Sequence, residues 1–209
     1  MFNFTSIILS APAILFCLTI HEYAHGLVAL RLGDPTAKYA GRLTLNPFKH
    51  LDLIGTISLF LFRFGWAKPV PVNPSYFKNQ KQGMMITSLA GPAANIIAAI
   101  GFGLILRLTD MVVTTTNFAI IILEMFVFFN LILGIFNLIP IPPLDGSKII
   151  YYLLPQTMAY QYAQLERYGI FILFGIIILG QISGFSIFGM IIWPIVRFFS
   201  SIIVGHSIV

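Results

Sequence analysis

Two histidines and a glutamate in the first apolar segment are the side chains best placed to do chemistry, in the sequence His21-Glu22-Tyr23-Ala24-His25. Residues at positions i and i+4 share one face of a helix, so both imidazoles can reach one metal ion. Zinc suits this pair, with Zn–N distances of about 2.0–2.1 Å. Glu22 is offset by roughly 100° around the helix, which predicts a general base for zinc-activated water and not a further ligand.

The third ligand must come from elsewhere, because catalytic zinc usually has three protein ligands and one open position. An ionisable cluster in an apolar segment is costly, at about 2.5–3.5 kcal/mol for one central charge, and therefore indicates function. Asp145 is favoured because the prolines within residues 140–144 end a regular helix and can turn the carboxylate back toward the bundle. The full set of candidates is His50, Asp52, Asp110, Glu124, Asp145, Glu166 and His206.

Two side-chain amides are candidates for binding the substrate or the developing oxyanion. Asn137 and Asn95 each lie within or beside an apolar segment. Hydrogen bonding between helices uses the same residue types and stays an alternative for both. Asn137 is the stronger functional candidate because it adjoins the motif that contains Asp145.

The composition excludes an ordinary soluble enzyme. Hydrophobic residues make up 58% of the 209-residue chain, and Asp, Glu, Lys and Arg only 9%, against about 25% charged residues in soluble domains. Twelve Lys or Arg outnumber seven Asp or Glu, but these basic residues orient membrane spans and do not indicate nucleic acid. We therefore expect an all-α polytopic membrane protein that forms one compact bundle in the lipid bilayer.

Five apolar segments approach the length of about 20 residues that a bilayer crossing needs. The predicted spans are residues 5–31, 84–108, 117–139, 168–183 and 185–201. A proline-rich turn and a short amphipathic piece occupy residues 140–164. The bundle thus has about five to six transmembrane helices, the sixth arising if residues 51–66 also cross.

The insert between the first and second full spans contains an apolar run of ten residues, 53–62. Such a run is short for a span and typical of re-entrant or interfacial segments. Alternation at residues 43–45 and 56–59, with an Asn46-Pro47 turn signal between them, predicts a re-entrant, partly β-hairpin insert. We expect its edge to receive an unwound substrate by strand addition.

The basic residues predict the topology. Eight of the twelve lie between the first and second full spans: Arg31, Lys38, Arg42, Lys49, Arg63, Lys68, Lys78 and Lys81. The positive-inside rule places this insert in the cytoplasm, with the N-terminus outside and the C-terminus inside. His21, His25 and Asp145 then lie at one depth near the cytoplasmic face. If residues 51–66 spanned, Asp145 would emerge on the opposite side.

Three ordered motifs together resemble the site-2 protease family of intramembrane zinc metalloproteases. They are the histidine motif at residues 21–25, Gly91-Pro92-Ala93-Ala94-Asn95, and residues 137–146 ending in Leu144-Asp145-Gly146. Residues 41–47 and 65–74 are similar to a compact prokaryotic branch that lacks PDZ and nucleotide-sensing domains. The resemblance covers roughly residues 10–155.

The resemblance implies one zinc ion per chain, held by His21, His25 and Asp145, with Glu22 as the catalytic acid/base. It implies a single membrane-embedded protease domain over residues 1–209, with a catalytic core at about 5–155 and accessory C-terminal helices at about 165–205. The expected substrates are single-span membrane proteins or signal peptides. The expected location is the plasma membrane, with the active site near the cytoplasmic face, and a separate membrane partner for regulation is possible.

Two other classes of function stay open at this point. A membrane metal-ion transporter would use the same histidines and carboxylates to carry ions. A catalytically silent protein that binds membrane helices would need no chemistry at all. A closed ligand triad with an open water site argues against the transporter, and the intact Glu22 argues against the silent protein.

Overall fold

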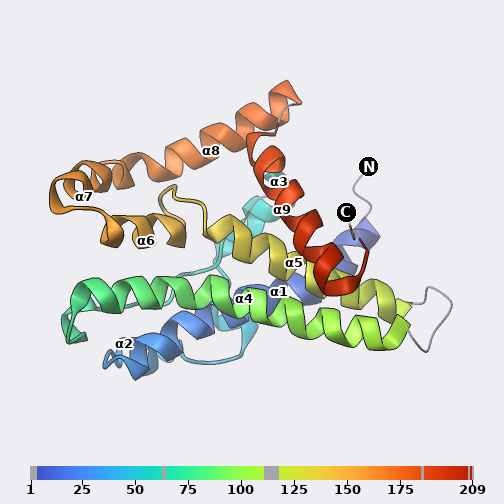
Figure 1. Ribbon diagram of the computed structural model, residues 1–209, viewed down its shortest axis with the longest axis horizontal. Helices are drawn as coiled ribbons and strands as arrows, with labels where there is room; N and C mark the ends of the chain where they lie inside the picture. The colour runs from blue at the N-terminus through green and yellow to red at the C-terminus, as the bar shows by residue number, and fades with distance from the viewer. Residues whose placement is uncertain (1–3, 63–64, 111–117, 185, 207, 209) are drawn as a thin grey trace.

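The computed structural model describes residues 4–62, 65–110, 118–184, 186–206 and 208, and within these ranges it contains helices and no named strand (Figure 1). The predicted all-α class is therefore confirmed. The helices are α1 Phe4–Arg31, α2 Thr36–Tyr39, α3 Leu53–Phe62, α4 Gln80–Asp110, α5 Phe118–Asn137, α6 Asp145–Leu153, α7 Gln156–Ala163, α8 Glu166–Ser183 and α9 Ile187–Val204, with short 3-10 turns at Pro47–Lys49 and Pro74–Tyr76.

Four helices in the described part of the chain are long and apolar enough to cross a membrane: α1, α4, α5 and α9. A fifth span is possible if α7 and α8 count as one, although these two helices are bent by 58° at their break. The expectation of a multi-pass membrane protein is thus confirmed, with four or five candidate spans. Gly184, in the left-handed conformation with φ of 70°, ends α8 before α9 begins.

Three of these helices, α1, α4 and α5, pack against one another and run roughly along the long axis of the molecule (Figure 1). α9 crosses them diagonally and contacts α5 and α4. The buried core that α4, α5 and α9 share is aliphatic and includes Leu106 of α4, Val127 and Leu131 of α5, and Val196 of α9, each fully buried. Packing of these apolar faces sets the positions of the polar side chains on the same helices.

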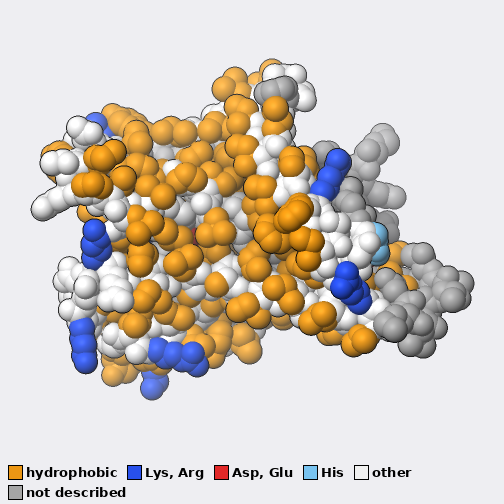
Figure 2. All heavy atoms as spheres, viewed as in Figure 1, with side chains coloured by type: hydrophobic (Ala, Val, Ile, Leu, Met, Phe, Trp, Pro, Cys, Tyr) orange, Lys and Arg blue, Asp and Glu red, His pale blue; other side chains and the backbone are white. Residues whose placement is uncertain are grey.

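The surface matches a membrane belt. Figure 2 shows hydrophobic side chains over the broad middle of this face, while Lys and Arg side chains gather toward the two ends of the long axis. Many of the exposed hydrophobic side chains belong to candidate spans, for example Ile97 of α4 at 69% and Phe171 of α8 at 75% exposure. Lipid tails are the natural solvent for such side chains.

The predicted β-hairpin insert is not supported. Residues 43–45 form a bend, and Leu53–Phe62 is the helix α3. Asp52 explains the difference, because its Oδ1 accepts a hydrogen bond from the backbone N–H of Gly55 at 2.8 Å, which is the geometry of a helix N-cap. One isolated antiparallel bridge, Leu51 to Ala67, is the β-type pairing that remains in the described insert.

Residues 51–66 do not form a spanning helix in the described part of the insert. α3 has ten residues, which corresponds to about 15 Å of helix, half of a hydrocarbon core. Residues 63–64, which belonged to this alternative, lie outside the described residues. The alternative of a sixth span here therefore receives no support from the helix lengths.

The proline-rich turn after α5 reverses the chain and starts α6 at Asp145. Gly146 permits this reversal, because a Cβ there would lie 2.2 Å from the carbonyl oxygen of Leu138. Gly169 lets α8 approach the same turn, since its Cβ would lie 2.5 Å from the carbonyl oxygen of Pro142. The Tyr162 hydroxyl of α7 donates a hydrogen bond to the carbonyl oxygen of Pro140 at 2.7 Å. Both α7 and α8 thus contact the turn.

Candidate metal centre

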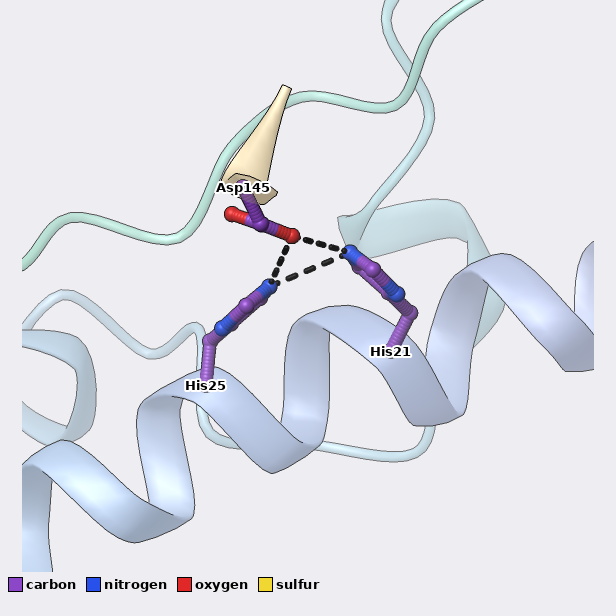
Figure 3. Close-up of side chains that lie close together, drawn as sticks. All are labelled: His21, His25 and Asp145. Atoms are coloured by element: carbon purple, nitrogen blue, oxygen red, sulfur yellow. Dashed lines mark hydrogen bonds and ion pairs between the residues drawn. The ribbon is translucent and has the colours of Figure 1, made fainter. Parts of the chain in front are cut away.

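Three ligand-type side chains converge between α1 and the start of α6 (Figure 3). Nε2 of His21 lies 3.0 Å from Oδ2 of Asp145, and Nε2 of His25 lies 3.1 Å from the same oxygen. The two Nε2 atoms are 3.1 Å apart. One atom from each side chain therefore stands at the corner of a nearly equilateral triangle.

This triangle fits a zinc ion. An ion about 2.0–2.1 Å from three ligand atoms in tetrahedral geometry requires those atoms to be about 3.3–3.4 Å apart, only slightly more than the distances in the structure. The side chains are also shielded from solvent, with exposed fractions of 6% for His21, 12% for His25 and 9% for Asp145. Two imidazoles and a carboxylate are a usual ligand set for catalytic zinc.

The other ring nitrogen of each histidine, Nδ1, is hydrogen-bonded, as is usual for histidines that bind a metal through Nε2. Nδ1 of His21 lies 2.7 Å from Oδ1 of Asn95, and Nδ1 of His25 lies 2.7 Å from the carbonyl oxygen of Thr87. A carbonyl oxygen can only accept, so Nδ1 of His25 carries the proton in this contact. Each Nε2 then points toward Asp145 and is available as a ligand.

Asp145 stays ionised in this setting. Burial raises the pKa of its carboxyl, but His21 and His25 beside it outweigh burial and hold the pKa well below its usual range. Nζ of Lys148, one turn further along α6, lies 3.7 Å from the second carboxylate oxygen. The anionic form is the one that ligates metals.

Gly91 of α4 gives the imidazoles their space. A Cβ at this position would lie 2.3 Å from Nε2 of His25 and 2.7 Å from Cε1 of His21. Side-chain atoms do not approach so closely, so any larger residue would push at least one ring away. Glycine at position 91 therefore lets α4 come into direct contact with the ligand rings.

Glu22 faces the same cavity as the ligands and is held by the insert. Its Oε2 accepts a hydrogen bond from the backbone N–H of Val70 at 2.8 Å. The cavity has a volume of about 670 Å³, is mostly apolar, and is lined by both histidines, Glu22 and Asp145. Glu22 is thus beside the metal cluster without belonging to it, as the sequence spacing predicted.

The two candidate amides differ in position. Asn137 lines the cavity, and its Nδ2 donates to the carbonyl oxygen of Leu133 at 3.0 Å. Asn95 is fully buried and contacts His21 from the side away from the cluster. The oxyanion role stays a prediction for both residues, with Asn137 the one that faces the space a substrate would enter.

The other ligand candidates from the sequence have different partners in the described structure. His50 contacts the carbonyl oxygen of Thr44 at 2.8 Å, Asp52 caps α3, and Glu124 pairs with His206 at 3.3 Å. Glu166 lies in the first turn of α8. The side chain of Asp110 lies outside the described residues. The metal cluster found among the described residues comprises His21, His25 and Asp145.

Two backbone contacts of the site were not predicted from the sequence: the carbonyl of Thr87 and the N–H of Val70. Backbone groups carry no side-chain signal, so residue types cannot identify them. The Val-Pro alternation at residues 69–72 hints that one N–H is isolated between prolines, which have none. Only the fold reveals which acceptor that N–H meets.

Comparison with known proteins agrees with this geometry. The model of "Peptidase family M50" matches residues 10–180. "Putative zinc metalloprotease YwhC" of Bacillus subtilis (strain 168) is 40% identical over 184 residues, which cover 86% of this chain and 81% of that protein. No solved structure matches the chain.

Two mycobacterial proteins named "Putative zinc metalloprotease Rip2" are also similar. The one from Mycolicibacterium smegmatis is 33% identical over 63% of this chain and 52% of its own length. The one from Mycobacterium tuberculosis (strain ATCC 25618 / H37Rv) is 28% identical over 86% of this chain and 70% of its own length. Because the family match includes both histidines, Glu22 and Asp145 and extends over most of the chain, this protein belongs to peptidase family M50, the site-2 protease family, and is a membrane-embedded zinc metalloprotease.

Proposed function

We propose that this protein is an intramembrane endopeptidase that hydrolyses peptide bonds within or near the transmembrane segments of other membrane proteins. One observation carries the proposal: the triangle of Nε2, Nε2 and Oδ2 atoms and the carboxylate of Glu22 line one cavity. Peptide hydrolysis needs an electrophile, a water molecule and a proton acceptor at one place. The side chains that line this cavity are candidates for holding all three in one place.

His21, His25 and Asp145 would hold one zinc ion per chain. When bound, zinc supplies a Lewis acid for the scissile carbonyl and makes water acidic enough to react near neutral pH. Glu22 takes the proton from the attacking water and later returns it to the leaving amine. Asn137 can support the oxyanion, because its amide nitrogen carries two hydrogens and gives one to Leu133.

The cavity lining indicates the class of substrate. Its walls come from α1, α4, α5 and α8 and include Leu133, Phe136, Leu173 and Phe174, all apolar side chains suited to residues from a membrane-spanning segment. A helix hides each peptide bond in an i to i−4 hydrogen bond, so the substrate must unwind locally before it is cut. Single-span membrane proteins and remnant signal peptides are the proposed substrates, as in regulated intramembrane proteolysis.

The proposed location is the plasma membrane, with the cavity near the cytoplasmic face. The support is the concentration of basic residues in the segment that joins α1 to α4. Residues 1–209 act as one protease domain in this proposal, with the core at about 5–155 and the helices at about 165–205 accessory to it. α8 contributes to the cavity wall, so the accessory helices also shape the substrate site. A separate membrane protein would supply regulation.

The test is cleavage by purified protein in lipid vesicles with a panel of single-span substrates. Glu22→Gln should lower the cleavage rate roughly 100- to 10,000-fold, the range for loss of a general acid/base, while zinc remains bound. Glu124→Gln is the matched control, because Glu124 pairs with His206 outside the cluster, and it should cleave normally. Flux of metal into the vesicles would support a transporter instead. A wild type that holds zinc, cleaves none of the panel and moves no metal would overturn the protease proposal.

A further inference from the structure

His21 is bound by a chain of buried amides that joins the three core spans. Oδ1 of Asn95, on α4, lies 2.7 Å from Nδ1 of His21, on α1. Nδ2 of Asn95 donates to the carbonyl oxygen of Cys17 at 2.9 Å and to Oδ1 of Asn130, on α5, at 3.0 Å. Nδ2 of Asn130 donates to the carbonyl oxygen of Phe126 at 2.7 Å. Both asparagines are 0% exposed.

Two backbone carbonyls fix the direction of every bond in this chain. The carbonyl of Phe126 can only accept, so Nδ2 of Asn130 must face it and Oδ1 of Asn130 must face Asn95. The carbonyl of Cys17 likewise requires Nδ2 of Asn95. Both hydrogens of that nitrogen are then used, and only the oxygen of Asn95 is left for His21.

Nδ1 of His21 must therefore be the donor. A neutral imidazole with its proton on Nδ1 keeps a lone pair on Nε2, which is the atom that points at His25 and Asp145 (Figure 3). The opposite tautomer would place two acceptors 2.7 Å apart in a buried site, where an unpaired polar atom costs about 1–3 kcal/mol. The amide chain thus selects the tautomer that can ligate a metal.

Asn95 also braces the helix turn that carries His21. In a regular α-helix the carbonyl of Cys17 accepts the backbone N–H of His21, four residues later, and Asn95 donates to that same carbonyl. The side chain of Asn95 therefore contacts both the ring and the turn beneath it. Hydrogen bonding that served only to stabilise helix packing would not require the contact with a ligand ring.

We propose that Asn95 is a positioning residue that holds His21 in the Nδ1–H tautomer with Nε2 directed at the metal, and that Asn130 fixes the orientation of the Asn95 amide. This inference rests on the proposed function only in taking His21 as a zinc ligand. His25 receives the equivalent support from the backbone carbonyl of Thr87, which no side-chain substitution removes. The hydrogen bond between Asn95 and His21 comes from a side chain, so mutation can test it.

The experiment measures zinc affinity in purified full-length protein in detergent, by competition with a chelator and without substrate. Asn95→Leu removes the acceptor and should weaken zinc binding roughly 10- to 100-fold, as for other partners of metal-bound histidines. Asn95→Asp keeps an acceptor for Nδ1 but turns its second oxygen toward the acceptors of Cys17 and Asn130, which costs stability. Its zinc binding should still weaken severalfold less than that of Asn95→Leu, because the ligand ring keeps its partner. Thr109→Val is the control on the same helix, since the Thr109 hydroxyl donates to the carbonyl oxygen of Ile105 and not to a ligand, and its zinc affinity should equal that of the wild type.

Nitrogen-15 NMR of labelled histidine in the zinc-free protein, where no metal fixes the tautomer, gives a second measurement that a merely structural role would not move. The chain has four histidines, so the variants His50→Gln, His206→Gln and His21→Gln each remove one signal and identify that of His21. We expect protonated Nδ1 on His21 in the wild type and in Asn95→Asp. If Asn95→Leu does not fold, Asn95→Asp alone decides the question by this signal and by its zinc affinity.

The outcomes separate this inference from the proposed function. A wild type that binds no zinc would overturn the proposed function and the inference with it. A wild type that binds zinc, with Asn95→Leu binding equally tightly, would overturn the inference alone. The inference alone would also be overturned if Asn95→Asp loses zinc as completely as Asn95→Leu. Zinc affinity would then depend on the amide donors to Cys17 and Asn130 and not on the acceptor for His21.

Discussion

The backbone N–H of Val70 donates a hydrogen bond to Oε2 of Glu22 across 2.8 Å, although the two residues are 48 positions apart in the sequence. Glu22 lies on α1, and Val70 lies in the loop of residues 65–73 that follows α3. The bond fixes one carboxylate oxygen and leaves the other for chemistry. Orientation of the proton acceptor thus depends on a segment outside the three core spans.

Val70→Pro should lower the cleavage rate, because proline has no backbone N–H to donate. Hydrogen bonds to charged groups contribute about 1.5–3 kcal/mol, and we expect a loss of roughly tenfold in kcat, which corresponds to the low end of that range. Zinc content should not change, since no ligand contacts this N–H in the described structure. Cleavage kinetics and metal analysis of the same preparation check both statements.

Val70→Ala is the control for this substitution. It keeps the N–H but shortens a side chain that is 8% exposed and packs beside Gly26. Its kcat should exceed that of Val70→Pro severalfold. Equal rates for the two variants would mean that packing of Val70, and not its hydrogen bond, supports Glu22.

Gly91→Ala should abolish zinc binding without unfolding the protein. The new methyl group would lie 2.3 Å from Nε2 of His25, so the ring must leave the triangle that an ion requires. Gly101→Ala is the matched control on the same helix, because a Cβ there meets nothing within 4 Å. Metal analysis and circular dichroism of both variants test this. Full zinc content in Gly91→Ala would show that the ligand rings have more room than the structure gives them.

The positions of the membrane helices could be predicted from the sequence. Apolar runs of about 20 residues have few structural alternatives, and the predicted spans at 5–31 and 117–139 correspond to α1 and α5 within a few residues at each end. The meeting of His21, His25 and Asp145 could also be predicted, because His21 and His25 share a helix face and the prolines before Asp145 interrupt a helix. The structure brings these three side chains together.

The insert could not be predicted in the same way. Alternation at residues 56–59 suggested a strand, but four residues of alternation are weaker than an N-cap, and Asp52 supplies that cap to α3. Hydrogen bonding of Asn95 between helices was among the sequence alternatives, but its partners were hidden, because they lie on α1 and α5 and become neighbours only when three helices pack. Interactions between distant segments leave no local pattern in a single sequence.

Zinc should stabilise the folded protein through Asp145. A ligand that binds only the folded state at a free concentration of 100 times its dissociation constant contributes about 2.7 kcal/mol. The wild type should therefore unfold at a higher temperature with zinc than with a chelator. Asp145→Ala removes one corner of the triangle and should lose most of this difference. Thermal unfolding in detergent measures it, and an undiminished zinc effect in Asp145→Ala would place the ion elsewhere.

Asp34→Ala should loosen the 65–73 loop and so affect Glu22 from a distance. Oδ2 of the fully buried Asp34 accepts the backbone N–H of Asn73 at 2.7 Å, and Oδ1 accepts the N–H of Thr36 at 2.9 Å. Leaving such donors without a partner costs about 1–3 kcal/mol, which should accelerate amide hydrogen exchange of the loop roughly tenfold or more.

The readout is hydrogen exchange followed by mass spectrometry of peptides from the loop and from α5. In Asp34→Ala the loop peptide should exchange faster while the α5 peptide keeps its wild-type rate, because Asp34 contacts the loop and not the core helices through its carboxylate. Zinc affinity should stay at the wild-type value and kcat should fall, since Val70 would then hold Glu22 for less of the time. A loop that exchanges at the wild-type rate in this variant would show that its other anchors, Arg42 to the Lys68 carbonyl and Lys68 to the His50 carbonyl, suffice to fix it.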